Sequence, residues 1–148
     1  MTFRVGYDIG GVIIDDLKNG GTEVPGAFDT IAKLVNKFGA DNNFIISKAA
    51  KEPTATRSWL LTNNFYGRTG FDPENLLFCH ERHEKAGLAH KLGLDCFMSD
   101  RADVLRPMID TRLKCLFEIK GPQTWLVPTS GMRRIASWDA FWELCGKR

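Results

Sequence analysis

A carboxylate that could act as a nucleophile stands near the start of the chain. The segment Arg4–Asp15 reads RVGYDIGGVIID, so the apolar run Phe3–Tyr7 ends at Asp8 and is followed by Gly10 and Gly11. An aspartate held at the end of a strand can attack an electrophile or bind a hard cation. It can also begin an ordinary turn, because Asp and Gly are both common turn residues. The residues at the other strand ends have to distinguish these two interpretations.

Polar side chains follow two further apolar runs. Ser47 ends the run FIIS, and Ser99 and Asp100 follow DCFM. Hydroxyl and carboxylate groups are ligands for phosphate oxygens and for Mg²⁺. Ser99 or Asp100 could equally cap the next helix, with Asp103 as the acid of its first turn. Capping and metal binding are compatible, and capping would not explain Asp8.

One lysine has an informative position. Lys85 shares the spacing i, i+3, i+4, i+7 with Leu88, Ala89 and Leu92, which places it on the apolar face of a predicted helix. It lies near the start of that helix, so we expect it to reach the carboxyl edge of a sheet as a fixed positive charge. The alternative is a lysine that extends past the apolar stripe to solvent.

The elements that would position these residues alternate between strands and helices. Alternation with helices of about ten residues indicates βαβ units and a parallel sheet covered on both faces, whose ligands bind at the carboxyl ends of the strands. We therefore predict one α/β domain spanning residues 1–148. The expected strands are Phe3–Tyr7, Phe44–Ser47, Leu76–Phe78, Asp95–Met98, Leu113–Ile119 and Arg134–Ala136, and the expected helices are Phe28–Phe38, Thr56–Phe65, Arg82–Leu92, Arg101–Ile109 and one from about Trp138 to Cys145.

Composition excludes several classes of protein. A formal net charge of +2 does not indicate a nucleic-acid or membrane surface, and no apolar run is long enough to cross a bilayer. The four cysteines lack metal-ligand spacing, so we expect buried free thiols and a cytoplasmic protein. Cys79, His80 and His83 have no second half of a zinc site. The glycine-rich phosphate loops of nucleotide-binding proteins are absent.

Taken in order, Asp8-Ile-Gly-Gly-Val, Ser47, Lys85 and Ser99-Asp100 resemble the motifs of the haloacid dehalogenase-like superfamily. Val24–Ala27 is similar to the entry into the first helix, and Phe97–Leu105 is similar to the fourth motif, so the resemblance covers nearly the whole chain. It implies a three-layer Rossmann-like sheet. The short intervals between motifs leave no room for a separate cap domain, only for a flap at about residues 14–23. The ending Ile135–Trp138 resembles a small nucleotidase-like branch.

The resemblance implies a Mg²⁺-dependent phosphatase that forms an aspartyl-phosphate on Asp8. Ser47 and Lys85 would complete the catalytic set by binding and neutralising the phosphoryl group. The implied metal ligands are Asp8, the Gly10 carbonyl and Asp100, with Asp103 as a supplement. The implied substrate contacts are Gly10, Gly11, Lys48 and Arg82, with Arg57 and Arg101 as further candidates.

Two departures from the superfamily pattern limit this expectation. Gly10 stands where a second aspartate usually serves as general acid and base, and Ser99 replaces an acidic residue of the fourth motif. General acid–base catalysis contributes about 10²–10⁴-fold in rate. The chain could therefore be a slow phosphatase, use Asp15 or Asp16 instead, or accept substrates with good leaving groups. It could also be a catalytically degenerate module that binds a phosphorylated ligand or protein. A hydrolase of carbon–halogen bonds is a further alternative, although such members usually carry a helical cap.

The missing cap also bears on the partners. An uncapped site is open to water and to large substrates, which favours a phosphate on a macromolecule or a site closed by a second copy of the chain. A phosphorylated small molecule and a homo-oligomer both stay open. No membrane or nucleic-acid partner is indicated.

Overall fold

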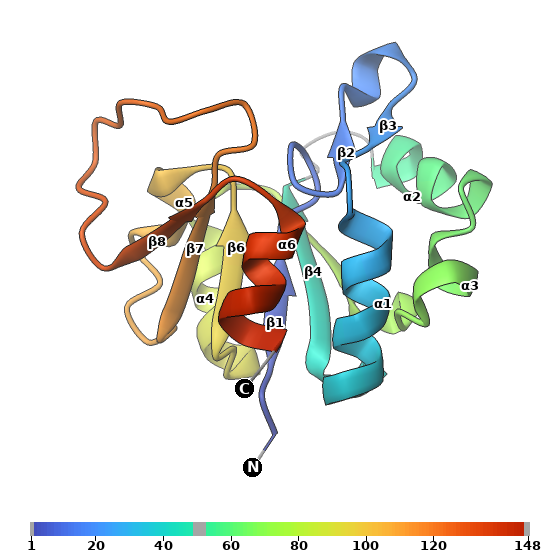
Figure 1. Cartoon of the computed structure of the whole chain (residues 1–148), viewed down its shortest axis with the longest axis horizontal. Helices are drawn as coiled ribbons and strands as arrows, with labels where there is room; N and C mark the ends of the chain where they lie inside the picture. The colour runs from blue at the N-terminus through green and yellow to red at the C-terminus, as the bar shows by residue number, and fades with distance from the viewer. Residues whose placement is uncertain (1, 49–52, 147–148) are drawn as a thin grey trace.

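A six-stranded parallel sheet forms the centre of the fold, in the computed structural model that describes residues 2–48 and 53–146 (Figure 1). The strand order is β5-β4-β1-β6-β7-β8, and every neighbouring pair is parallel. The strands are β1 (Val5–Tyr7), β4 (Asn43–Lys48), β5 (Leu76–Cys79), β6 (Cys96–Ser99), β7 (Leu113–Phe117) and β8 (Met132–Ile135). The predicted α/β class and all six strands are thus confirmed.

The central strands are apolar on both sides because both faces of the sheet are covered. Tyr7 pairs in register with Ile45 and Met98, and all three side chains enter the cluster on one face. Their sequence neighbours Ile46 and Phe97 point to the cluster on the opposite face. This alternation with a period of two is the reason why the strands read as short continuous apolar runs.

Helices pack on both faces of this sheet. The front face in Figure 1 carries α1 (Ala27–Phe38) and α6 (Trp138–Phe141), which continues as a π-helical turn over Trp142–Gly146. The back face carries α4 (Glu84–Leu92) and the short α5 (Ala102–Leu105). The core also holds all four cysteines as buried free thiols, as the sequence predicted. The described helices are all too short or too polar to cross a membrane.

The segment predicted as a flap is an antiparallel hairpin of β2 (Ile14–Asp15) and β3 (Thr22–Glu23) with a 3₁₀ turn at Leu17–Asn19 between them. It projects above the sheet next to α2 (Pro53–Thr62), while α3 (Phe65–Thr69) packs beside α1 (Figure 1). Residues 2–48 and 53–146 therefore include a small flap and no separate cap, as expected. The remaining 3₁₀ turns are Ala40–Asn42 and Pro73–Asn75.

Two predicted helices differ from the observed ones. The single helix expected over residues 56–65 is wrong: α2 ends at Thr62 and α3 begins at Phe65, because Asn64 between them adopts a left-handed conformation with φ of 52°. The helix expected over residues 101–109 stops at Leu105. Pro107 lacks a backbone N–H and cannot continue the helical hydrogen bonds, so the chain turns away towards β7.

Candidate active site

Asp8 occupies the first position after β1, at the carboxyl edge of the sheet. Its backbone N–H donates to the Met98 carbonyl oxygen at 2.9 Å, so the residue is still held by the neighbouring strand β6. The chain then turns tightly, because the N–H groups of Val12, Ile13 and Ile14 all converge on the carbonyl oxygen of Ile9. Asp8 is only 3% exposed, so this carboxylate lies at the bottom of the loop and not on its surface.

The Asp8 carboxylate is held from two sides. The Lys85 ammonium donates to Oδ1 and the Ser99 hydroxyl donates to Oδ2. We call Asp8, Lys85 and Ser99 the inner cluster; all three residues are buried. Burial raises the pKa of Asp8, whereas the charge and hydrogen bond of Lys85 and the hydrogen bond of Ser99 lower that pKa. Lys85 therefore supplies the charge that favours an ionised carboxylate in a buried place.

Asp100 lies beside this cluster and is partly buried. Burial and the nearby Asp8 carboxylate raise the pKa of Asp100 to about 6. A Cβ added to Gly11 would overlap the Asp100 Oδ2 atom, and Gly11 has a φ of +75°. Glycine is thus required at position 11 for two reasons: it permits the left-handed backbone conformation, and it lets a carboxylate approach the main chain.

Gly10 differs from its neighbour in both respects. It is exposed, its φ is not positive, and a Cβ added there would meet no atom within 4 Å. Nothing steric in the described part of the chain therefore requires glycine at position 10. An aspartate could be built there without displacing the loop.

These residues line one pocket of about 280 Å³ at the carboxyl edge of the sheet. Three further cations line it, and we call Lys48, Arg82 and Arg101 the cationic rim. Lys48 and Arg82 are exposed, and Arg101 is partly buried. Counting Lys85, four cationic side chains face two carboxylates, so the pocket suits an anion. The complete lining is Asp8, Ile9, Gly10, Ser47, Lys48, Arg82, Lys85, Asp100 and Arg101.

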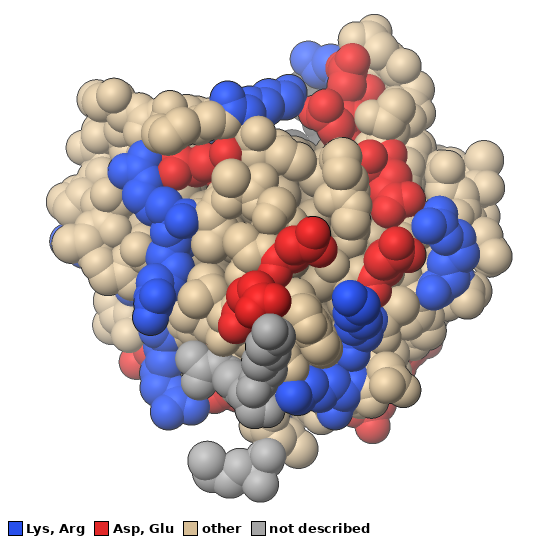
Figure 2. All heavy atoms as spheres, in the orientation of Figure 1, with Lys and Arg blue, Asp and Glu red and all other residues tan. Residues whose placement is uncertain are grey.

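The outline of the molecule is hollowed between the flap and the long β7–β8 loop (Figures 1 and 2). Lys120 from that loop pairs with Asp15 of the flap at 3.3 Å, and this pair joins the two projections. Elsewhere on the face shown in Figure 2, basic side chains form a row over the β7–β8 side and acidic side chains lie near the middle. Charges of both signs share this face, in keeping with the small net charge.

Oxygen donors for a magnesium ion are present but few. Asp8 and Asp100 are carboxylates that line the same pocket, and hard oxygen ligands are what Mg²⁺ prefers. Among the described residues no group of three or more His, Cys, Asp or Glu side chains is placed to hold a metal. The donor set therefore fits an ion that keeps several waters and uses a backbone carbonyl, and it does not fit zinc. Cys79, His80 and His83 form no metal cluster in this part of the chain.

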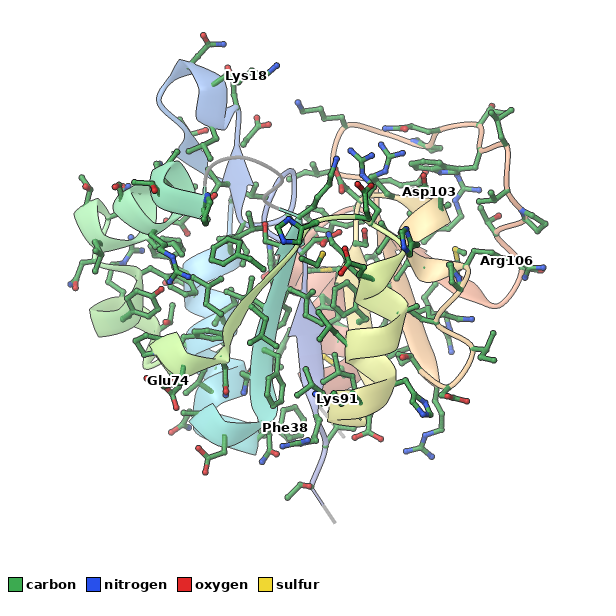
Figure 3. All side chains as sticks on the ribbon, turned by 180° about the vertical axis from the view of Figure 1, so that it is seen from behind. Lys18, Phe38, Glu74, Lys91, Asp103 and Arg106 are labelled. Carbon is green, nitrogen blue, oxygen red and sulfur yellow. The ribbon has the colours of Figure 1, made fainter. Side chains whose placement is uncertain are left out.

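Several sequence candidates are not brought to the pocket. Asp103 accepts two hydrogen bonds from Arg101 and is absent from the pocket lining, although it lies at the same edge of the sheet in Figure 3. Arg57 stacks over the Phe78 ring at 4.7 Å. Asp15 pairs with Lys120, and Asp16 accepts from Asn19 within the flap. None of these four residues lines the pocket.

Two features of the site escaped sequence reasoning. The sequence suggests Ser99 as a strand-end ligand, as a helix cap and as a departure from a motif, but not the contact found here, in which its hydroxyl donates to Asp8. The contact follows from the pairing of β1 with β6. Tyr7 pairs with Met98, so the next residues on the two strands, Asp8 and Ser99, are also neighbours. Asp103 was read as a metal ligand because its type fits, but only side-chain direction reveals its pairing with Arg101.

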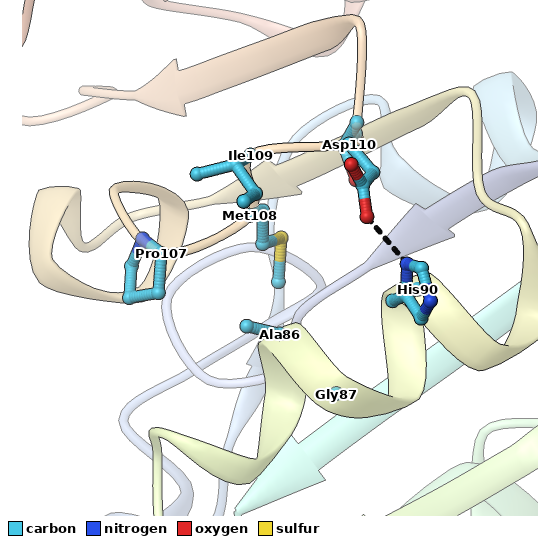
Figure 4. A pocket seen from close by; sticks show the side chains of 8 residues that line it. Ala86, Gly87, His90, Pro107, Met108, Ile109 and Asp110 are labelled. Atoms are coloured by element: carbon cyan, nitrogen blue, oxygen red, sulfur yellow. Dashed lines mark hydrogen bonds and ion pairs between the residues drawn. The ribbon is translucent and has the colours of Figure 1, made fainter.

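A second cavity of about 370 Å³ lies between α4 and residues 107–111 (Figure 4). Its walls include Ala86, Gly87, Met108 and Ile109, and two of its polar side chains, His90 and Asp110, contact each other through His90 Nδ1 and an Asp110 carboxylate oxygen. It holds no nucleophile beside a cation. The chemistry at the carboxyl edge therefore remains the candidate site.

Comparisons with known proteins address the fold. No protein-family model and no curated protein sequence matches the chain. Among solved structures, the crystal structure of D,D-heptose 1,7-bisphosphate phosphatase from Burkholderia thailandensis matches with a TM-score of 0.65 at 14% identity, over 99% of this chain and 100% of that one. A solution structure of a de novo designed Rossmann 3x3 fold protein matches with a TM-score of 0.51 at 16% identity, over 99% and 94% of the two chains. The chain thus has an uncapped Rossmann-like fold similar to that of a known phosphatase, which confirms the fold expected from the haloacid dehalogenase-like resemblance.

Proposed function

We propose that this protein is a Mg²⁺-dependent phosphatase that transfers a phosphoryl group from a phosphate monoester to Asp8 and then to water. The observation that carries the proposal is the inner cluster: a buried carboxylate, paired with a buried lysine, at the bottom of a pocket with a cationic rim. Such a carboxylate is positioned as a nucleophile, and the surrounding cations match the charge of a phosphate. The similarity in fold to a bisphosphate phosphatase supports the same reaction class.

In the first step, an Asp8 oxygen attacks phosphorus and the bond to the ester oxygen breaks. The products are an aspartyl-phosphate and an alkoxide or aryloxide, which takes a proton from water. Lys85 stays next to the Asp8 carboxylate and offsets negative charge where the two anions meet. Ser47 lines the same pocket and would donate its hydroxyl hydrogen to a phosphoryl oxygen.

In the second step, water attacks phosphorus, inorganic phosphate leaves and a proton is released, so Asp8 returns as a carboxylate. Asp8, Asp100 and the carbonyl of Gly10 would hold Mg²⁺, with Gly11 leaving room for Asp100. When bound, the ion would neutralise charge on the phosphoryl oxygens. Lys48, Arg82 and Arg101 would bind the transferred phosphate or a second anionic group of the substrate.

Gly10 sets the expected limits of this activity. Without a carboxylate at position 10, no side chain there protonates the leaving group, so esters with good leaving groups should react much faster than alkyl phosphates. A specific alternative follows from the same residue. A protein that retains the anion pocket but lacks the proton donor could serve as a module that binds a phosphorylated ligand or protein.

Hydrolysis of an aryl phosphate with and without Mg²⁺ tests the proposal. Wild-type protein should release phosphate only with the metal, and Asp8→Asn should abolish the release. Gly10→Asp should raise the rate for alkyl phosphates by about 10²–10⁴-fold, the usual contribution of general acid–base catalysis. Phosphate binding without turnover, both in the wild type and in Gly10→Asp, would contradict the phosphatase and favour the binding module.

A further inference from the structure

Arg101 is the only member of the cationic rim with an ion pair among the described residues, and its partner is Asp103. Nε of Arg101 donates to Oδ1 at 2.9 Å, and Nη2 donates to Oδ2 at 2.7 Å. Both carboxylate oxygens thus face one guanidinium, in the two-point geometry that fixes the plane of an arginine.

The same arginine is also anchored through its backbone. The N–H of Arg101 donates to the Ser99 hydroxyl oxygen at 3.1 Å, and that hydroxyl in turn donates to Asp8. The residue is therefore tied to the nucleophile at one end and to Asp103 at the other. The two bonds to Asp103 use Nε and Nη2, so Nη1 is left for an acceptor in the pocket that Arg101 lines.

The geometry points to Asp103 as a positioning residue that holds the Arg101 guanidinium in place to bind a phosphate oxygen at the mouth of the pocket. This inference rests on the part of the proposed function that places a phosphate in the pocket. It replaces the metal-ligand role that the residue type of Asp103 suggests. A magnesium ion would have to displace the guanidinium from both Asp103 oxygens, and Asp103 does not line the pocket.

Charge alone and positioning predict opposite effects of removing Asp103. Deleting a negative charge close to an anion site strengthens the attraction for phosphate if nothing else changes. Deleting the group that orients Arg101 weakens phosphate binding, because a free arginine side chain must lose its rotational freedom when the anion binds. The sign of the change therefore distinguishes the two.

The experiment measures orthophosphate binding by calorimetry in the presence of Mg²⁺, and Mg²⁺ binding in a separate titration. Arg101→Gln should weaken phosphate binding about tenfold and Asp103→Ala about three- to tenfold, as expected for a charge-assisted hydrogen bond and its positioning. The double variant should bind phosphate no more weakly than Arg101→Gln, because Asp103 acts through Arg101. Mg²⁺ affinity should not fall in any of the three, because Asp103 would not hold the metal and loss of the Arg101 charge favours a cation near Asp8 and Asp100. Asp110→Ala, which removes an exposed paired aspartate elsewhere, is the matched control and should bind like the wild type.

Three results would overturn the inference. These are tighter or unchanged phosphate binding in Asp103→Ala, weaker Mg²⁺ binding in that variant, or additive losses in the double variant. Because the readout is binding, a protein without turnover whose phosphate affinity still follows the predicted pattern would contradict the phosphatase and leave the role of Asp103 supported.

Discussion

The inner cluster and the cationic rim both place charged side chains at the same pocket, but they differ in how far these side chains are buried. Lys85 and Asp8 pair with side-chain exposures of 6% and 5%, whereas Arg101 and Asp103 pair with exposures of 41% and 42%. A buried pair resists loss of either partner, because the remaining charge has no water to solvate it. An exposed pair is worth little to stability but can still fix a geometry when it is bidentate. Burial therefore suits the residues that must not move, and exposure suits those that meet an incoming anion.

The largest expected effect comes from breaking the buried pair. Lys85→Met leaves the Asp8 carboxylate unpaired, which should cost about 3–5 kcal/mol in the free energy of unfolding. Under the proposed function, the rate should also fall about 10²–10³-fold, as for loss of a preorganised charge. Denaturant titration and the aryl phosphate assay measure the two effects.

Two controls accompany Lys85→Met. Lys91→Met, on the exposed side of α4, should behave like the wild type. Asp8→Asn combined with Lys85→Met should regain much of the lost stability, since no unpaired charge remains. If Lys85→Met alone were as stable as the wild type, the buried pair of Lys85 and Asp8 would not contribute to stability as proposed.

The two adjacent glycines offer a smaller and more local test. Gly11→Ala forces an added methyl group against Asp100 and strains a left-handed backbone, so Mg²⁺ affinity should fall about 10–100-fold, as when a group that positions a metal ligand is changed. Gly10→Ala has open space around it and should bind the ion normally. Calorimetric titration with Mg²⁺ compares the pair. Equal affinities in the two variants would place the metal away from Asp100.

Substitution of an exposed residue of the cationic rim should change phosphate affinity only a few-fold. Arg82→Gln removes a cation that has no ion pair among the described residues, so the free energy of unfolding should stay within about 0.5 kcal/mol of the wild type. Phosphate affinity should fall a few-fold at low ionic strength, and the difference should shrink in high salt. A loss of phosphate affinity that does not depend on salt would indicate a direct, desolvated contact. Arg82 would then behave like the buried residues of the inner cluster and not like an exposed rim residue.

The sequence predicts the residues at strand ends better than their partners. Asp8, Ser47 and Asp100 follow recognisable apolar runs, and parallel strands bring their carboxyl ends to one edge, so their convergence was predictable. The pairing of Asp103 with Arg101 depends on side-chain direction, which neither period nor spacing specifies. The break between α2 and α3 was missed for a similar reason. It depends on the left-handed backbone conformation of Asn64, which the spacing of apolar residues does not predict.

The smallest expected effect is on the acid dependence of stability, through the contacts of Glu118 after β7. Arg134 and the backbone N–H of Gln123 bind Glu118 and, with Arg134 as the main cause, lower the pKa of that carboxyl from 4.5 to about 2. A lowered pKa means that the folded state favours the ionised form. The resulting stability is therefore present above pH 4.5 and is lost as the pH falls from 4.5 towards 2. Thermal unfolding across this range should show a weaker acid dependence in Arg134→Gln. An identical dependence in both proteins would assign the acid sensitivity to other groups.

A phosphoryl group covalently bound to Asp8 during turnover would identify this residue as the nucleophile. The protein is mixed with Mg²⁺ and an aryl phosphate, quenched in acid within milliseconds, digested and examined by mass spectrometry. We expect one added phosphoryl group on the peptide that contains Asp8, and none in Asp8→Asn. Phosphate release with no modified peptide, or release that persists in Asp8→Asn, would contradict this role of Asp8.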